Sequence, residues 1–220
     1  MRRILRENGL SLVLAACFVL FLAGQIIAGH RVYNADQVSH GQAVVSLSAY
    51  LASGHFLEAL TENMESEFLQ MFAYVLLTVS LFQKGSAESK KLDEEESVDR
   101  DPRTSRASDA PWPVRKGGLA LRLYENSLSL AFLLLFLVSF VLHAISGASE
   151  YNQEQLVHGQ DTVSTMAYLG RSRFWFESFQ NWQSEFLSIG AMVVLSIFLR
   201  QRGSPESKPV DAPHSQTGTD

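Results

Sequence analysis

The sequence has little of several features that define common protein classes. It has one cysteine in 220 residues, which excludes a disulfide framework and any zinc or iron–sulfur site built from cysteines. Its 23 acidic residues outnumber its 18 basic ones and no basic cluster is present, which argues against nucleic-acid binding. No GxSxG, HExxH, P-loop or dinucleotide-binding motif occurs, so the sequence indicates no common class of enzyme.

Charge is also nearly missing from four windows of the chain. Two of these apolar runs, roughly residues 10–28 and 128–145, have about the 20 residues needed to cross a hydrocarbon core of ~30 Å. The other two, residues 68–82 and 186–199, are shorter. They span a bilayer only by beginning upstream or by thinning it, and the alternative is an interfacial or re-entrant helix.

The chain repeats itself at a constant offset of 118 residues. Residues 6–90 and 124–208 align without a gap and share 35 identities in 85 positions, which chance does not give. The sequence therefore predicts an all-α membrane protein with four transmembrane helices, built from two tandem helical-hairpin repeats. Repeat 1 covers 1–90 and repeat 2 covers 119–208. The expected spans are at about 10–28, 66–83, 128–146 and 184–200.

The segments between and beside the predicted spans have a different character. Residues 91–118 are rich in charge and proline and lack apolar periodicity, which predicts a flexible cytoplasmic linker. Residues 209–220 are predicted to be a disordered polar tail. Each outer loop is expected to contain a short amphipathic helix, near Ser46–Ala52 in the first copy, followed by a long helix that enters the membrane.

Lysine and arginine are divided unevenly between the two sides of this topology. The N-terminus, the linker with its flanks and the C-terminal segment carry 15 of them, and the two outer loops carry 3. The positive-inside rule then places both termini and the linker in the cytoplasm. Both copies should have the same orientation, as in a parallel repeat.

A cleaved signal peptide is the alternative for the N-terminal run. Residues Leu14-Ala15-Ala16-Cys17 have the form of a lipoprotein cleavage site. The apolar run nevertheless continues through Leu22, whereas a polar segment should soon follow a cleavage site. We therefore expect Cys17 to be an ordinary small residue of a membrane helix.

Several motifs occur in both copies and support a family resemblance. They are Glu-Asn-x-Leu-Ser-Leu, Tyr-Asn-x-x-Gln-x-x-His-Gly-Gln, Ala-Tyr-Leu, Asn-x-x-Ser-Glu-Phe-Leu and Gly-Ser-x-Glu-Ser-Lys. Through them the chain resembles a family of small bacterial inner-membrane proteins known only as a domain of unknown function, over about 170 residues. The resemblance implies a bacterial cytoplasmic (inner) membrane location and a helical architecture, and it implies no activity, cofactor or catalytic residue.

An asparagine–glutamate pair lies at the outer edge of the second apolar run of each copy. The pairs are Asn63 with Glu67 and Asn181 with Glu185. A carboxylate that enters a membrane helix must face water, the bundle or a partner. We expect the two glutamates at the wet interface and the asparagines bonded to a neighbouring helix. The alternative is an outward-facing cation or proton site with paired carboxylates.

Histidine also recurs, at His40 and His158, each just before a glycine that suits a turn. A metal site needs several converging ligands, and most of those near His40 have no counterpart in the second copy. We therefore expect both histidines to bond loop backbone, with no metal or other cofactor. The stripe of Trp175, Phe179, Trp182 and Phe186 is expected to be an interfacial aromatic belt, with cofactor stacking as the alternative.

Together these features predict a non-enzymatic function. We expect a structural or regulatory component of the membrane, in contact with the lipid bilayer and with a membrane-protein partner or a second copy. A small cation or proton translocator that uses Glu67 and Glu185 is the first alternative, and a metal- or cofactor-dependent membrane enzyme is the second.

Overall fold

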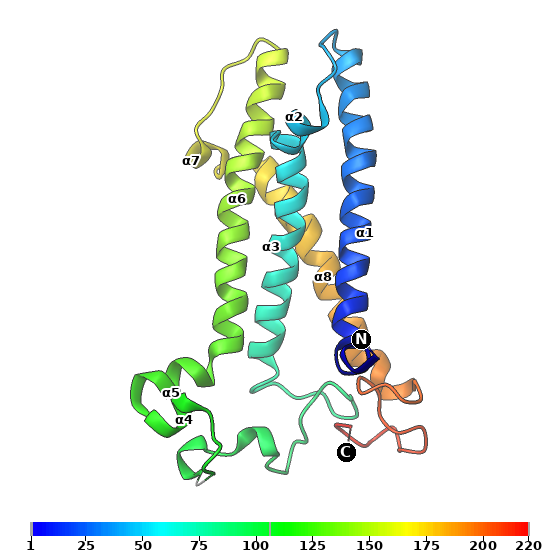
Figure 1. Ribbon diagram of the computed structural model, residues 1–220, viewed down its shortest axis with the longest axis vertical. Helices are drawn as coiled ribbons and strands as arrows, with labels where there is room; N and C mark the ends of the chain where they lie inside the picture. The colour runs from blue at the N-terminus through cyan, green and yellow to red at the C-terminus, as the bar shows by residue number, and fades with distance from the viewer. Residues whose placement is uncertain (1, 106, 220) are drawn as a thin grey trace. The chain divides into compact units, whose positions relative to one another are not determined.

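A computed structural model describes residues 2–105 and 107–219, and within them it contains helices and loops but no strand (Figure 1). This confirms the predicted all-α class. Four helices are long, namely α1 (Arg2–Ser39), α3 (Gly54–Leu77), α6 (Ser127–Val157) and α8 (Ser172–Phe198). The short elements are α2 (Leu47–Leu51), η1 (Ser97–Asp99), η2 (Pro102–Thr104), α4 (Trp112–Lys116), α5 (Gly118–Glu125) and α7 (Thr165–Tyr168).

The chain forms two compact units. Unit 1 consists of Met1–Thr61 and Val141–Phe174, so it holds α1, α2, α7, the start of α3 and the outer half of α6. Unit 2 consists of Glu62–Phe140 and Trp175–Asp220, so it holds most of α3 and α8, the charged linker and the tail. Each unit is described separately below.

Two helices in the described residues are long and apolar enough to cross a membrane, α1 over Arg3–Ser39 and α6. The most apolar window of α1 has no buried residue, and only 17% of the window in α6 is buried. Leu10 and Phe21, for example, are 76% and 71% exposed. A surface this apolar indicates association with lipid.

The long helices of unit 1 extend well beyond their apolar runs. α1 continues through Tyr33 to Ser39, about three turns past the predicted span. It ends because Gly41 adopts a positive φ of 72° while the N–H of Gln42 donates to the Gln37 carbonyl. This is a Schellman cap, and α6 ends in the same way at Gly159 and Gln160. The His-Gly-Gln motif is therefore a helix stop.

After each stop, one asparagine holds the returning loop. The Asn34 side chain donates to the Val45 carbonyl and accepts from the Val45 N–H at 2.7 Å. Asn152 makes the same two bonds with Val163, 118 residues later. The next residue then caps a short helix, because Ser46 Oγ accepts from Ala49 N–H. The short helix expected near Ser46–Ala52 is thus present as α2, and α7 follows the same plan.

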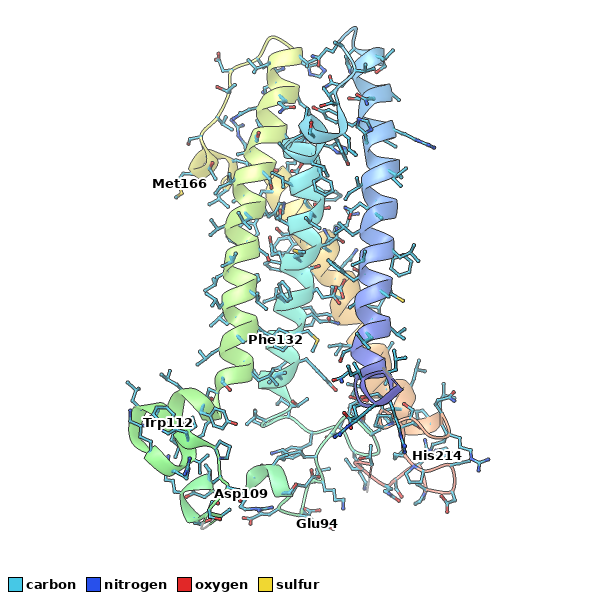
Figure 2. The ribbon with its side chains drawn as sticks, viewed as in Figure 1. Glu94, Asp109, Trp112, Phe132, Met166 and His214 are labelled. Carbon is cyan, nitrogen blue, oxygen red and sulfur yellow. The ribbon has the colours of Figure 1, made fainter. Side chains whose placement is uncertain are left out.

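The short helices pack a tyrosine against a glycine of the preceding long helix. Tyr50 of α2 is 2% exposed, and its hydroxyl occupies the space where a Cβ at Gly29 of α1 would lie. Tyr168 of α7 is fully buried, and a Cβ at Gly147 of α6 would come within 2.9 Å of its hydroxyl oxygen. Met166 of α7, in contrast, points outward and is 77% exposed (Figure 2).

Unit 2 joins the C-terminal segment to the turn that follows α3. The Lys208 ammonium is buried and donates to the backbone carbonyls of Gly85, His214 and Gln216, among others. The Gly85 N–H in turn donates to the Thr217 hydroxyl oxygen. His214, labelled in Figure 2, contacts the Ile197 carbonyl near the end of α8. Residues 208–218 are thus held by defined hydrogen bonds.

The tyrosine–glycine contact should make Gly29 intolerant of any side chain. We expect Gly29→Ala to lower the free energy of unfolding by about 1–3 kcal/mol, because the methyl group would displace Tyr50. Gly24→Ala on the same helix is the matched control, since a Cβ there meets nothing within 4 Å. Thermal unfolding in detergent, followed by circular dichroism, compares the two. Equal midpoints for both variants would contradict the packing described here.

Candidate functional site

The C-terminal ends of α1 and α6 line a small polar cavity in unit 1. Its volume is about 60 Å³, enough for an ion with a water molecule or two. At its outer end the rings of His40 and His158 meet edge to face, with centres 6.4 Å apart. Asp36 and Glu154 line the cavity one helical turn below them. The cavity thus collects the two predicted histidines and two carboxylates that sequence reasoning did not select.

Hydrogen bonds fix the orientation of both imidazoles. His40 Nδ1 lies 3.0 Å from the Asp36 backbone oxygen, and His158 Nδ1 lies 2.7 Å from the Glu154 backbone oxygen. Both histidines were expected to bond loop backbone, but they bond helix backbone instead, because α1 and α6 extend past the predicted spans through Asp36 and Glu154. A second contact joins His40 Nδ1 to Asp36 Oδ1 at 3.5 Å, and Arg173 forms an ion pair with Glu154.

The inner end of the cavity holds a buried carboxylate, Glu150, which is 7% exposed. It accepts a hydrogen bond from the backbone N–H of His55, and its Oε2 has no hydrogen-bond partner in the described residues. Beside it, the Tyr33 hydroxyl donates to Gln153 Oε1 at 3.1 Å. An acceptor buried without a donor costs free energy, so this position favours a bound water, proton or cation.

Tyr33 of the cavity lining belongs to a cluster of aromatic rings and two histidines beside α2. The ring centres of Tyr33 and His55 are 5.2 Å apart, and those of His30 and Tyr50 are 5.6 Å apart. Burial raises the pKa of Tyr50, and the nearby Glu150 carboxylate adds to the effect. Burial lowers the pKa of His55, against the opposite influence of Asp36 and Glu154. Burial also raises the pKa of Glu150, to about 7.

A second polar cluster in unit 1 lies between α6 and the start of α3. Glu58 is 7% exposed and His143 is fully buried, and their potential ligand atoms lie within 4.8 Å of each other. The Tyr168 hydroxyl donates to Glu58 Oε1 at 3.2 Å. The His143 ring lies against Phe174, with centres 4.7 Å apart. This cluster is enclosed by packed side chains, whereas the cavity described above is open at the helix ends.

The predicted asparagine–glutamate pairs lie in unit 2 and take different environments. Asn63 and Glu67 of α3 are exposed, while Asn181 and Glu185 of α8 are half-buried. Asn181 donates to the Glu177 carbonyl of its own helix. Both pairs therefore lie on long helices as expected, but the structure does not bury the two glutamates alike.

The buried carboxylate of α3 in unit 2 is Glu65, not Glu67. Glu65 is fully buried, and the indole N–H of Trp182 donates to its Oε1 at 3.0 Å. Glu58, Thr61 and Glu65 share the spacing of one helix face, a signal that the sequence contained. Trp182 also meets Phe179, with ring centres 5.5 Å apart, so part of the aromatic stripe packs on this glutamate.

The chain thus belongs to the class of all-helical proteins with two helices of membrane-spanning length and composition. It is a member of the family described as domain of unknown function (DUF6766), whose match covers residues 1–219. This confirms the resemblance seen in the sequence motifs. Comparison with curated proteins and with solved structures finds no match.

The lowered pKa of His55 makes stability depend on pH with a definite sign. The folded state favours the neutral ring, so the unfolded state binds more protons once the pH drops below about 6.5. The stability contributed by the neutral His55 ring should be present above that pH and be lost as the pH falls through the lowered folded pKa, whereas Glu150, with its pKa raised to about 7, acts in the opposite direction in both proteins. His55→Gln should show a shallower decline, measured as thermal midpoints in detergent between about pH 7 and pH 5. If the thermal midpoints of the natural protein and of His55→Gln fall equally with pH, groups other than His55 cause the effect.

Proposed function

We propose that the protein is a four-span integral membrane protein with a structural or regulatory function rather than an enzymatic one. The observation that carries this proposal is that the apolar window of α1 has no buried residue and that only 17% of the window of α6 is buried. Leaving so many large apolar side chains in water costs roughly 25 cal/mol for each Å² of surface, and lipid removes that cost. Lipid is therefore the first partner in this proposal, and a membrane-protein partner or a second copy is the next.

The lengths of α3 and α8 support two further spans. Their 24 and 27 residues extend for about 36 and 40 Å, which exceeds a hydrocarbon core of ~30 Å. Both helices begin upstream of their apolar runs, and the run of α3 itself contains a polar residue, Gln70. Gln70 is satisfied there, because its amide donates to the Glu185 carbonyl at 2.9 Å.

Matching local bonds support the tandem-hairpin organisation that this topology assumes. Three local features recur 118 residues apart. They are the glycines of the Schellman caps, the asparagines that bond Val45 and Val163, and the serines that cap α2 and α7. Ser89 Oγ accepts from the Gln83 N–H, and Ser207 Oγ accepts from the Gln201 N–H, so the exit motifs match as well. We propose two hairpins with the same orientation in a bacterial cytoplasmic membrane, with both termini and the linker in the cytoplasm.

Reporter fusions test the topology. Fusions after Asp101 and at the C-terminal tail should give a cytoplasmic signal, and a fusion near Gln42 should give an exterior signal, because 15 of the 18 basic residues lie on the first side. An exterior signal at Asp101 would mean that α3 does not cross the membrane, and the four-span proposal would fail.

A cation or proton translocator remains the second candidate. The bond between Gln70 and the Glu185 carbonyl brings α3 and α8 together about one turn from Glu67, as a shared site for the two glutamates requires. The half-exposed setting of these residues favours the structural function instead. Cation or proton flux in reconstituted vesicles distinguishes the translocator from the structural component.

Proteoliposomes loaded with a pH-sensitive dye should show no proton uptake above that of empty vesicles. Glu67→Gln with Glu185→Gln should change neither the flux nor, by more than about 1 kcal/mol, the stability, because neither group is a buried unpaired charge. The linker variant Glu95→Gln is the control. A flux that the double variant abolishes and the control retains would establish the translocator.

A further inference from the structure

We propose that Asp36, His40, Glu154 and His158 bind a divalent transition-metal ion of the Zn²⁺ class at the outer ends of α1 and α6. In each helix an acid precedes a histidine by four residues, so the two side chains lie one above the other on the same face. The two acid–histidine pairs line one cavity and face each other across it. Two imidazoles and two carboxylates form a complete set of four ligands for such an ion.

The hydrogen bonds of both histidines prepare them as ligands. A backbone carbonyl only accepts, so Nδ1 of His40 and of His158 carries the proton in its bond to the residue four positions earlier. Each Nε2 therefore has a free lone pair. Histidines that bind metals are usually oriented in this way, through the second ring nitrogen. The ion pair with Arg173 likewise holds the Glu154 side chain in one orientation.

The distances require a small closure on binding. Two imidazoles on one tetrahedral ion, with metal–nitrogen bonds of about 2.0–2.1 Å, have ring centres roughly 5–5.5 Å apart. The centres of His40 and His158 are 6.4 Å apart, so a movement of about 1 Å is needed. Both rings are exposed at the helix ends, so a shift of the helix ends can supply it without breaking the Nδ1 hydrogen bonds. Among the described residues no three of these four donors have ligand atoms within 4.8 Å of one another, so the two carboxylates must also move toward the histidines when the ion binds.

An independent observation places a ligand in the same cavity. Glu150 lines the cavity below the four donors, is 7% exposed, and has an oxygen without a donor in the described residues. A water that donates to Glu150 and to one of the metal-bound carboxylates would supply that donor. The site also collects three carboxylates against the single guanidinium of Arg173, which favours a cation. Because two ligands are imidazoles, Zn²⁺, Co²⁺ or Ni²⁺ suits the site better than Mg²⁺ or Ca²⁺.

Metal titration of the full chain in detergent tests this proposal, whatever the number of spans. Stripped protein should bind one Co²⁺ with the visible absorption bands of mixed nitrogen and oxygen ligands, and Zn²⁺ should displace it. His40→Ala with His158→Ala should weaken binding at least tenfold, and Glu150→Gln, which acts through the water, should weaken it about tenfold while keeping the bands. His214→Ala, in the tail of unit 2, should bind like the natural protein.

The proposal would be overturned by any of these results: no Co²⁺ binding by the natural protein, Co²⁺ binding without ligand-field bands, or unchanged affinity in the double histidine variant. Circular dichroism checks that each variant keeps its helices. If the double histidine variant does not, Asp36→Asn with Glu154→Gln replaces it, since these changes preserve side-chain shape. Mg²⁺ at the same concentration should neither compete with Co²⁺ nor raise the unfolding temperature, and competition by Mg²⁺ would equally contradict the assigned metal class.

Discussion

The outer part of unit 1 depends on a two-way hydrogen bond between an asparagine side chain and a valine backbone. After α1 stops at its glycine, the chain is extended and has no helix or strand to satisfy its polar groups. Asn34 supplies both a donor and an acceptor to Val45, and the loop is fixed in register. That register sets where α2 begins, and therefore which glycine of α1 receives Tyr50.

Apolar runs and the residues that begin or end helices explain how much of the fold was predictable from the sequence. The apolar runs located α1 and α6, and Ser46 and the surrounding pattern located α2, because caps and apolar periodicity are local properties. The sequence did not predict that α1 continues from Tyr33 to Ser39. This polar segment has the composition of a loop, and only the folded structure shows that one of its faces is buried. The start of α3 at Gly54 was missed for a similar reason, because Gly54 lies tightly against the Glu150 backbone, a contact between distant segments.

The site was predicted only in part, because recurrence in both copies was used to select residues. Residues that occur twice at the polar ends, such as Asn34, Gly41 and His40, maintain local structure that both halves need. The buried acids are single, since Glu58, Glu65 and Glu150 correspond to Phe176, Gln183 and Val32. Recurrence therefore finds the scaffold and the histidines at the helix ends, whereas the buried, unmatched carboxylates become visible only after folding.

The hydrogen bonds of the Lys208 ammonium determine how unit 2 opens. One ammonium holds carbonyls from the turn at Gly85 and from the tail near Gln216, so neither segment can leave without stranding a buried charge. Backbone amides on both sides, including the Gly218 N–H that donates to Ser86, should then exchange with solvent in a single cooperative event. The last residues of the chain would behave as part of one foldon with the turn after α3, and would not fray independently as chain ends usually do.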